Sequence, residues 1–529
     1  MQRLALIIAA VALITPATAV PADVSVSDDA QLRRAVSGAE AGTTILIAPG
    51  SYSEGISARG LRGEEGRPIV LRAADPEHPP VFEGGGSGIH LADVSDLELH
   101  DLIVTGASGN GINIDDGSSA DTPSRRIVLR GVVVRDVGPE GNRDGIKLSG
   151  VEDFRVEGCT IERWGARGSG LDMVGCHRGV VADCVVRHTE GKGDNGVQTK
   201  GGSRDIVIRR CRFECAGQRG ANVGGSTGLA YFRPRPEGYE ATDITVEDCT
   251  FIGSLTPVAF VGVDGATVRH NTIYRPRRWG FRVLQENGDL DFVACRNGRF
   301  TDNLIAFRSD EMTVPVNVGS GTAIETFTIA RNAWYCIDEP ARSRPQLPVQ
   351  EIDGLYGVDP GFRDAEQGDL RTKPDGPAAR AGVRTNSRPT SGSAIGTRGE
   401  IGCGSDAKRV RRLKITEPGV YENLLVDGEW GDGALVKIEA DGVTLRRCEI
   451  RNGTHNGVTV VGKNVTIESC RIHHLLAGTY TEQRDAHGIT GRPTQLVIRN
   501  CDIGLTSGDA IQFDPGRGLW GDVLVENCT

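Results

Sequence analysis

The amino-acid sequence predicts an all-β protein: a right-handed parallel β-helix, which is a single-stranded solenoid, built as two consecutive solenoid segments. The 529-residue chain has 72 glycines and only 5% aromatic residues, a composition that favours short strands and tight turns over a helical bundle. One short pattern of alternating apolar residues recurs about every 29 residues, a period typical of a solenoid. No amphipathic helix separates the copies, which argues against a leucine-rich repeat.

The first element is an export signal, predicted over residues 1–19. Arg3 precedes the apolar run Leu4–Ile14, and Ala17-Thr18-Ala19 forms a small-residue cleavage site. The run is shorter than the about 20 residues that a membrane-spanning helix needs, and a buried N-terminal strand is the alternative. We therefore expect a secreted or periplasmic protein that is not transmembrane.

The next region, residues 20–85, is expected to form an N-terminal cap and the first coils. The segment Asp28–Val36 predicts a short helix with Ser27 as its N-cap. Such a helix suits a lid, because the first coil of a solenoid otherwise exposes its apolar end.

Residues 86–340 are predicted to form the main β-helix. Each copy of the repeat alternates apolar and variable residues, with an extra residue at a bend before a Cys or Asn position. These positions are Cys159, Cys184, Cys211, Cys249, Asn271, Asn303 and Asn332. Equivalent residues of successive coils stack about 4.8 Å apart, so we expect an inward column. The 13 cysteines are then expected to be structural thiols rather than disulfides, and the lack of a Cys-x-x-Cys pair disfavours zinc.

The remaining sequence predicts a closing tail and linker over residues 341–412, where Pro, Arg, Gly and Ser replace the repeat. The repeat returns over residues 413–529 as a second parallel β-helix. This second solenoid stops inside a repeat at Cys528-Thr529. We expect a truncated end, or an end that docks against something.

One sheet of the main solenoid is expected to present a row of outward side chains. By strand alternation they are Asn113, Lys147, Asp172, Gln198, Asn222, Ala259, Arg282 and Asn317. A strip of amides and charges on a rigid sheet suits an extended oligosaccharide. The alternative is an ordinary polar surface, where an ion pair contributes about 0–1 kcal/mol.

The strip contains the residue types that β-elimination of a uronate requires. A base must remove the proton next to the carboxylate, and a cation must stabilise the charge that develops. Lys200 and Lys147 are the candidate bases, and Arg219 is a candidate to hold the substrate carboxylate with two hydrogen bonds. Expected substrate-binding residues are Asn113, Gln198, Asn222, Arg233, Arg282 and Trp279. Expected ligands for Ca²⁺ are Asp144, Asp172, Asp194 and Asn195, and no organic cofactor is expected.

The second solenoid has a separate group of candidate residues. They are Asp485, His487, Asp509, Gln512 and Asp514. A histidine near carboxylates predicts an acid/base site, and hydrogen bonding within loops is the alternative.

Two stretches near the N-terminus, Ile45–Tyr52 and Gly66–Ala73, resemble the start of pectin-lyase-fold proteins, and are most similar to the chondroitinase B and alginate lyase group. Asn222–Gly228 resembles part of secreted bacterial right-handed β-helix proteins. The resemblance implies a lyase in which Lys200 occupies the catalytic lysine position. Asn195 and Asp194 stand where that group has carboxylates, and its arginine position holds Gly224.

The sequence as a whole predicts a secreted carbohydrate-active protein, a polysaccharide lyase that cleaves an acidic glycan. A glycoside hydrolase or uronate epimerase is the second hypothesis, and a glycan-binding or adhesion solenoid without catalysis is the third. The net charge of −10 leaves no global basic field for nucleic acid. The expected partner is an acidic polysaccharide.

Overall fold

The structure is a computed structural model that describes residues 23–233, 237–288, 292–372, 380–384, 402–403, 407–431, 433–475, 477–479, 482–499, 501–513, 523–526 and 528. The predicted export signal therefore lies outside the described residues. The chain divides into two compact units, Met1–Gly392 and Ser393–Thr529. Among the described residues, no helix combines the length and apolar character needed to cross a membrane. The finer domain boundaries expected from the sequence stay predictions.

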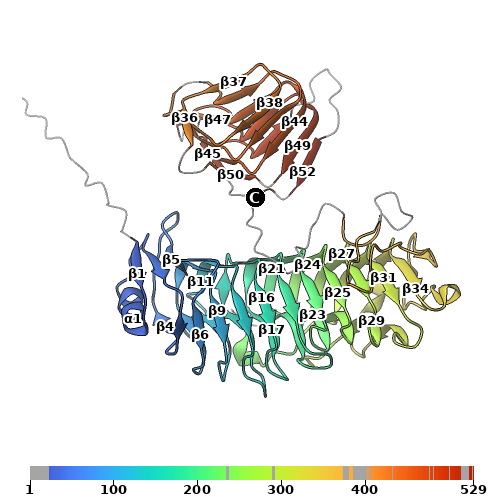
Figure 1. The fold of residues 1–529 in the computed structure, drawn as a ribbon. Coiled ribbons are helices and arrows are strands. Elements are labelled where there is room, and N and C mark those ends of the chain that lie inside the picture. The colour runs from blue at the N-terminus through green and yellow to red at the C-terminus, as the bar shows by residue number, and fades with distance from the viewer. Residues whose placement is uncertain are drawn as a thin grey trace, which may run out of the picture. The chain divides into compact units, whose positions relative to one another are not determined.

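The first unit is a right-handed parallel β-helix, as predicted, in which the coils stack along one axis (Figure 1). Within the described residues its strands form three parallel sheets, here named A, B and C. Sheet A contains β1 (Val24–Val26), β2 (Thr44–Ile47), β5 (Ile69–Ala73), β8 (Ser95–His100), β11 (Ser124–Arg130), β14 (Val151–Glu152), β15 (Arg155–Glu157), β18 (His177–Ala182), β21 (Ser203–Arg209), β24 (Ala241–Glu247), β27 (Val263–Arg269), β30 (Arg296–Thr301) and β33 (Thr328–Ala330).

Sheets B and C follow the same sequential stacking. Sheet B contains β3 (Ser51–Tyr52), β6 (Val81–Glu83), β9 (Ile103–Thr105), β12 (Val133–Arg135), β16 (Thr160–Glu162), β19 (Val185–Arg187), β22 (Arg212–Glu214), β25 (Thr250–Ile252), β28 (Thr272–Tyr274), β31 (Leu304–Phe307), β34 (Ala333–Cys336) and β35 (Leu355–Tyr356). Sheet C contains β4 (Ile56–Arg59), β7 (Ile89–Ala92), β10 (Ile112–Asp115), β13 (Ile146–Ser149), β17 (Ser169–Val174), β20 (Asn195–Lys200), β23 (Arg219–Gly224), β26 (Thr256–Val261), β29 (Trp279–Leu284) and β32 (Val314–Val318).

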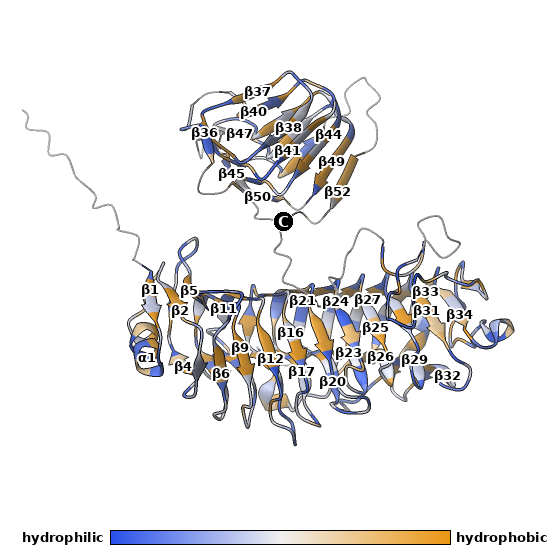
Figure 2. Cartoon of the chain, in the orientation of Figure 1, coloured by the Kyte–Doolittle hydropathy of each residue, from blue (hydrophilic) through white to orange (hydrophobic). Residues whose placement is uncertain are grey.

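The core runs along the inside of the coils. Apolar residues alternate with polar ones along the strands (Figure 2), and the apolar set faces inward, so that Leu171 and Met173 are both 0% exposed. Aromatic rings also stack between coils, with the Phe213 and Phe251 centroids 4.6 Å apart. Each fully buried large apolar side chain contributes about 1.5–3 kcal/mol, so the stacking of successive coils is itself the source of stability.

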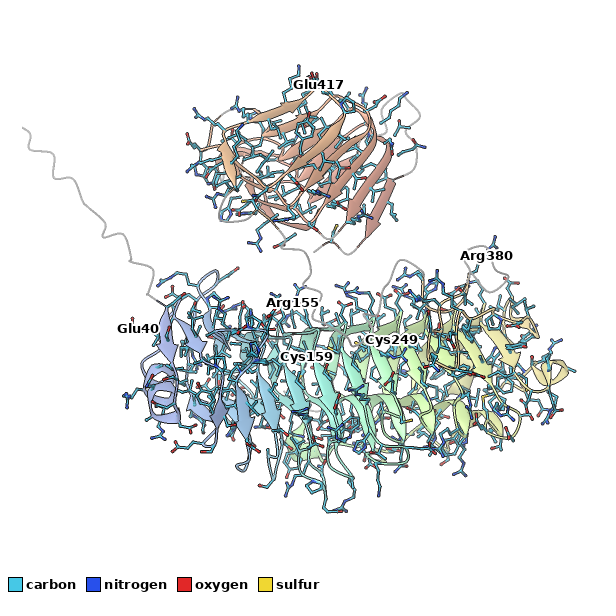
Figure 3. All side chains as sticks on the ribbon, in the orientation of Figure 1. Glu40, Arg155, Cys159, Cys249, Arg380 and Glu417 are labelled. Atoms are coloured by element: carbon cyan, nitrogen blue, oxygen red, sulfur yellow. The ribbon has the colours of Figure 1, made fainter. Side chains whose placement is uncertain are left out.

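The predicted inward column is confirmed. Cys211 N–H donates to Cys249 Sγ (3.4 Å), and Cys249 N–H donates to Asn271 Oδ1 (2.9 Å). Asn271 Nδ2 then donates to Asn303 Oδ1, and Asn303 Nδ2 donates to Asn332 Oδ1, each at 3.0 Å. Cys159 and Cys249 are labelled within the coils in Figure 3. All 13 cysteines lie in the described part of the chain and are free thiols.

The bend before this column has the left-handed conformation in successive coils. Its residues include Asp183, Arg210, Asp248, His270, Asp302 and Arg331, with φ between 52° and 58°. This conformation costs a residue with a side chain about 1–2 kcal/mol, and Asp tolerates it best. Acidic and basic residues alternate along the stack, so Arg210 pairs with Asp183 of the preceding coil at 2.7 Å. The bends therefore tie neighbouring coils together by charge.

The N-terminal cap is the helix α1 (Asp29–Ser37), which lies at the N-terminal end of the stack (Figure 1). Leu32 and Val36 are buried in the common core, as expected of a lid. The predicted N-cap is wrong by one residue. Asp28 caps the helix because its carboxylate accepts from Gln31 N–H at 2.7 Å, whereas the Ser27 hydroxyl contacts only the Gln31 side chain.

A short segment after the last coil, residues 380–384, lies against sheet B. Gly382 N–H donates to the Asp302 carbonyl (2.8 Å), and Val383 N–H donates to Thr272 Oγ1 (3.0 Å). Arg384 forms a bidentate pair with Asp248. This segment thus spans several coils and holds them together.

The second unit is also a parallel solenoid, again as predicted. Its described strands include three stacks of five. The stack that carries the predicted candidate residues contains β37 (Leu413–Ile415), β40 (Val436–Ile438), β43 (Val458–Val460), β48 (Ile489–Gly491) and β51 (Ile511–Phe513). Cys448, Cys470 and Cys501 are each 0% exposed, and they occupy the column position of this unit.

Candidate functional site

The predicted outward residues share one register position on sheet C. Neighbouring strands align His90, Asn113, Lys147, Asp172, Gln198, Asn222, Ala259, Arg282 and Asn317, named here the central row. A flanking row, three residues earlier in each coil, contains Ser169, Asn195, Arg219 and Thr256. At about 4.8 Å per coil, the central row extends for about 38 Å, the length of a short oligosaccharide chain.

The middle of the central row is covered, so the expectation of an open strip is wrong there. Asp172 and Asn222 are 1% exposed, Gln198 is 6% exposed, and Ala259 is 0% exposed. Alternation predicted the side of the sheet correctly, since the neighbouring Leu171 and Met173 face the core. Strand alternation cannot predict that another segment of the chain covers the outer face of the sheet.

The covering chain is fixed by a buried carboxylate, Glu240. It is 0% exposed, and it accepts from Gly201 N–H (3.0 Å), Thr227 N–H (2.8 Å) and Asn287 Nδ2 (3.1 Å). Gly225 lies directly on the site, where an added Cβ would be 2.7 Å from Gln198 Nε2. Glycine at this position therefore lets the chain approach the central row closely.

A cluster of two lysines and two aspartates forms the centre of the site. Lys147 Nζ is 3.1 Å from Asp144 Oδ2 and 2.5 Å from Asp172 Oδ2. Lys200 Nζ is 3.5 Å from Asp172 Oδ1 and donates to Gln198 Oε1 (3.2 Å). Asp172 Oδ1 is buried and has no hydrogen-bond donor among the described residues. The Lys147 and Lys200 side chains are 24% and 19% exposed, so both are partly accessible to solvent.

The electrostatics of this cluster separate the two lysines. Burial opposes the charge on Lys147, but the carboxylates of Asp172 and Asp144 outweigh it and raise the pKa of Lys147 above its usual value. Burial, followed by repulsion from Asp172, raises the pKa of Asp144. Carboxylates on both sides favour the charged ammonium of Lys147 over the neutral amine that a base requires, so Lys200, which lies farther from Asp172, is the better candidate base. Lys147 is a fixed counter-ion for the two carboxylates.

The four predicted calcium ligands do not converge on one point. Lys147 Nζ already lies between Asp144 and Asp172, and Asn195 Nδ2 donates to Ser169 Oγ (3.2 Å). Asp194 instead accepts from Gln218. In the described parts of the chain, no group of three or more His, Cys, Asp or Glu residues is arranged to hold a metal ion. As placed, these four residues do not fit a Ca²⁺ site.

Two candidate catalytic side chains reach the central row from opposite sides. Lys200 lies two residues after Gln198 in β20, and Arg219 lies three residues before Asn222 in β23. Lys200 leans back to Gln198, while Arg219 Nη1 leans forward and donates to Asn222 Oδ1 (3.0 Å). Gln198 and Asn222 are register partners, so the ammonium and the guanidinium bracket the same part of the row.

Arg219 also pairs with a residue that sequence reasoning missed. Arg219 Nη2 is 2.5 Å from Glu286 Oε1, although 67 residues separate them along the chain. Glu286 follows β29 and is partly exposed. A lone glutamate in a loop gives no signal in the sequence, and only the return of this loop across the sheet places it here.

Other predicted binding residues have different partners. Arg282 donates to Asn317 Oδ1 (2.9 Å), and its Cζ lies 4.2 Å from the Trp279 ring centroid. The guanidinium covers the aromatic ring that was expected to stack on a sugar. Arg233 pairs with the buried Asp116, so its charge compensates a buried carboxylate, and its role in substrate binding stays a prediction.

The N-terminal part of the central row is hydrogen bonded within itself. Asn113 Nδ2 donates to Asp115 Oδ2 (2.8 Å), and His90 Nε2 lies 2.8 Å from the same oxygen. Asn113 thus lies on the row as predicted, and its amide is engaged by the protein.

In the second unit, two of the predicted residues lie close together, with His487 Nδ1 4.0 Å from Asp509 Oδ2, and an acid/base role for the group stays a prediction. His487 is 8% exposed, and its Nδ1 accepts from the Asp509 N–H (2.9 Å). Asp485 is exposed, Gln512 is exposed opposite Thr490 in register, and Asp514 lies outside the described residues. Because a backbone donor occupies His487 Nδ1, the geometry favours hydrogen bonding within loops.

Residues 87–232 match the family model described as "Right handed beta helix region". A search among curated proteins gives no match. Among solved structures, the chain is similar to an alginate lyase from Paenibacillus sp. str. FPU-7, with 15% identity and a TM-score of 0.42 over 58% of this chain and 98% of that one. It is also similar to a PL6 family polysaccharide lyase from Pseudopedobacter saltans, with 14% identity and a TM-score of 0.40 over 68% and 99%.

A third similar structure is the GH136 lacto-N-biosidase from Eubacterium ramulus. The identity is 13% and the TM-score is 0.43, over 63% of this chain and 67% of that one. At these identities the likeness concerns the fold, which the sheets described above establish independently.

Proposed function

We propose that the partly exposed side chains of Lys200 and Arg219, beside the covered part of the central row, form the active site of a polysaccharide lyase that cleaves an acidic, uronate-containing glycan by β-elimination. The observation that carries this proposal is the approach of Lys200 and Arg219 to one part of the central row from opposite sides. An amine and a guanidinium in that arrangement provide the base and the cation that elimination needs.

Lys200 is the base in this proposal. The nearby carboxylate of Asp172 is already neutralised by Lys147 at 2.5 Å, whereas Lys200 lies 3.5 Å from it. As the neutral amine, Lys200 removes the proton on the carbon next to the uronate carboxylate. A carbon–carbon double bond forms while the carbon–oxygen bond to the leaving sugar breaks, and Lys200 returns the proton to the leaving oxygen.

Arg219 is the cation in this proposal. Its guanidinium already holds the Glu286 carboxylate with both terminal nitrogens in reach, at 2.5 and 3.4 Å. The same bidentate geometry suits the carboxylate of a uronate. When a substrate carboxylate takes the place of Glu286, the charge that develops during proton removal is stabilised by Arg219.

Two basic side chains at the site are placed to meet an acidic substrate. Lys200 and Arg219 are each partly exposed, with 19% of the side chain accessible, and a cation at the surface attracts the carboxylate of a uronate. Export of the chain to meet such a glycan is part of the same proposal.

A second candidate function, glycoside hydrolysis, is favoured by one observation. The pKa of Asp144 is raised by burial, and a protonated acid beside a second carboxylate is the arrangement that hydrolases use. Against it, Lys147 bridges Asp144 and Asp172, and Asp144 is 1% exposed. The elimination proposal is therefore preferred.

The test is incubation with alginate, pectate and chondroitin while the absorbance of unsaturated uronate ends is recorded. We expect an increase for the wild-type protein and its loss in Lys200→Ala. The matched control is Lys192→Ala, which removes an exposed lysine just before the same strand and should keep the activity. Reducing ends without that absorbance would support hydrolysis, and binding without products would support a non-catalytic solenoid.

A further inference from the structure

A polar groove lies on the outer face of sheet A, on a different sheet from the proposed active site. It encloses about 470 Å³ and is formed by β27, β30 and β33. Its lining includes Thr267, Arg269, His270, Arg299, Thr328 and Arg331. Thr267, Arg299 and Thr328 are register partners on three consecutive strands. Stacking therefore places a threonine on the strand on either side of Arg299, with adjacent strands about 4.8 Å apart.

The three arginines of this groove differ in their partners. Arg269 pairs with Glu247 at 2.8 Å, and Arg331 pairs with Asp302 at 2.7 Å. Arg299 is exposed, and no described residue forms a hydrogen bond or ion pair with it. Its five N–H donors and its charge are available to a ligand. The groove therefore carries one uncompensated positive charge, at its central strand.

His270 adds a second unused group to the groove. Its Nδ1 is buried and has no hydrogen-bond partner among the described residues. Burial and the nearby Arg384 lower the pKa of His270, so the ring is neutral near pH 7 and Arg299 is the source of the positive charge. A planar guanidinium flanked by hydroxyl donors matches an oxyanion, which accepts several hydrogen bonds at once.

We propose that this groove binds an oxyanion carried by a sugar, a carboxylate, sulfate or phosphate group, with Arg299 as its bidentate ligand and the hydroxyl of Thr267 or Thr328 as an additional donor. The proposal does not depend on the function proposed for sheet C. It gives sheet A an anion-binding face of its own.

The test is calorimetric titration of the full chain at low ionic strength with inorganic sulfate, inorganic phosphate and glucuronate as probes. We expect saturable binding of at least one probe, and the preferred probe identifies the source of the oxyanion. Arg299→Gln should weaken that binding at least tenfold. The matched control Arg308→Gln removes an arginine that pairs with Asp310 outside the groove, and it should bind as the wild type does.

Two further measurements separate binding from folding and from catalysis. Arg299 is exposed and unpaired, so Arg299→Gln should keep the wild-type unfolding midpoint and any eliminating activity. A Thr267→Val, Thr328→Val double variant should weaken binding severalfold while leaving Arg299 in place. The proposal is overturned if no probe binds the wild type, or if Arg299→Gln binds with wild-type affinity.

Discussion

Replacement of Asp172 by asparagine is the perturbation that examines the central cluster most sharply. Its side chain is 2% exposed and lies 2.5 Å from Lys147 Nζ and 3.5 Å from Lys200 Nζ. Removing one partner of a buried ion pair costs about 3–5 kcal/mol. Because both lysine side chains keep some contact with water, we expect the lower end, a loss of about 3 kcal/mol in the free energy of unfolding.

The assay is urea unfolding of wild type, Asp172→Asn, Lys147→Met and the double variant, with midpoints and slopes compared. Since the two residues contact each other directly, the double variant should lose about 2 kcal/mol less than the sum of the single variants. Asp121→Asn, at an exposed position, is the control and should change stability by less than about 0.5 kcal/mol. A loss for Asp172→Asn as small as that control, or strict additivity, would refute the reasoning.

Three further outcomes are expected. Asn303→Ala should lower the free energy of unfolding by about 3 kcal/mol, because it leaves buried hydrogen-bonding partners in two adjacent coils unsatisfied. Urea unfolding measures this loss, with Gln367→Ala at an exposed position as the control. Equal unfolding midpoints for the two variants would contradict the prediction. The raised pKa of Lys147 means that its stabilisation is complete below its ordinary pKa of about 10.4 and is lost as the pH rises from there through the folded-state pKa. Unfolding midpoints from about pH 10 to 12 should therefore fall less in Lys147→Met than in wild type. Treatment with a calcium chelator should leave the rate of elimination unchanged, since the Lys147 ammonium lies between Asp144 and Asp172, where a metal ion would otherwise bind. A loss of activity that added Ca²⁺ restores would show that the reaction needs calcium.

The register of the solenoid was predictable because it depends on local sequence. A strand alternates sides with period two, and each coil repeats the same bend. Knowing the position of Cys249 or Asn271 in the repeat is then enough to place the residues of the following strand on the inside or the outside. The central row and the buried column are both direct consequences of this rule.

The cover over the row was not predictable by the same rule. Glu240 and Glu286 act far from their sequence neighbours, since Glu240 accepts from Gly201 and Glu286 pairs with Arg219. Such contacts depend on how loops of irregular length return to the sheet. Loops lack a repeating sequence pattern, so their contacts cannot be predicted from periodicity. The same reason explains Arg233, whose partner Asp116 is 117 residues away.

The bends show an intermediate case. An aspartate at the bend before the column can be predicted from the sequence, because aspartate tolerates the left-handed backbone conformation found there. Arginine at the equivalent position, as in Arg210 and Arg331, follows only once stacking is known, since each then faces an aspartate of the neighbouring coil.

The central claim is that Lys200 and Arg219, brought together only by stacked coils, eliminate across a uronate linkage. The most direct measurement is mass spectrometry of the products formed from a polyuronate in water labelled with a heavy oxygen isotope. Elimination predicts unsaturated oligosaccharides, one water lighter than hydrolysis products and free of the label. Labelled reducing ends, or the same unlabelled products from Lys200→Ala, would contradict the claim.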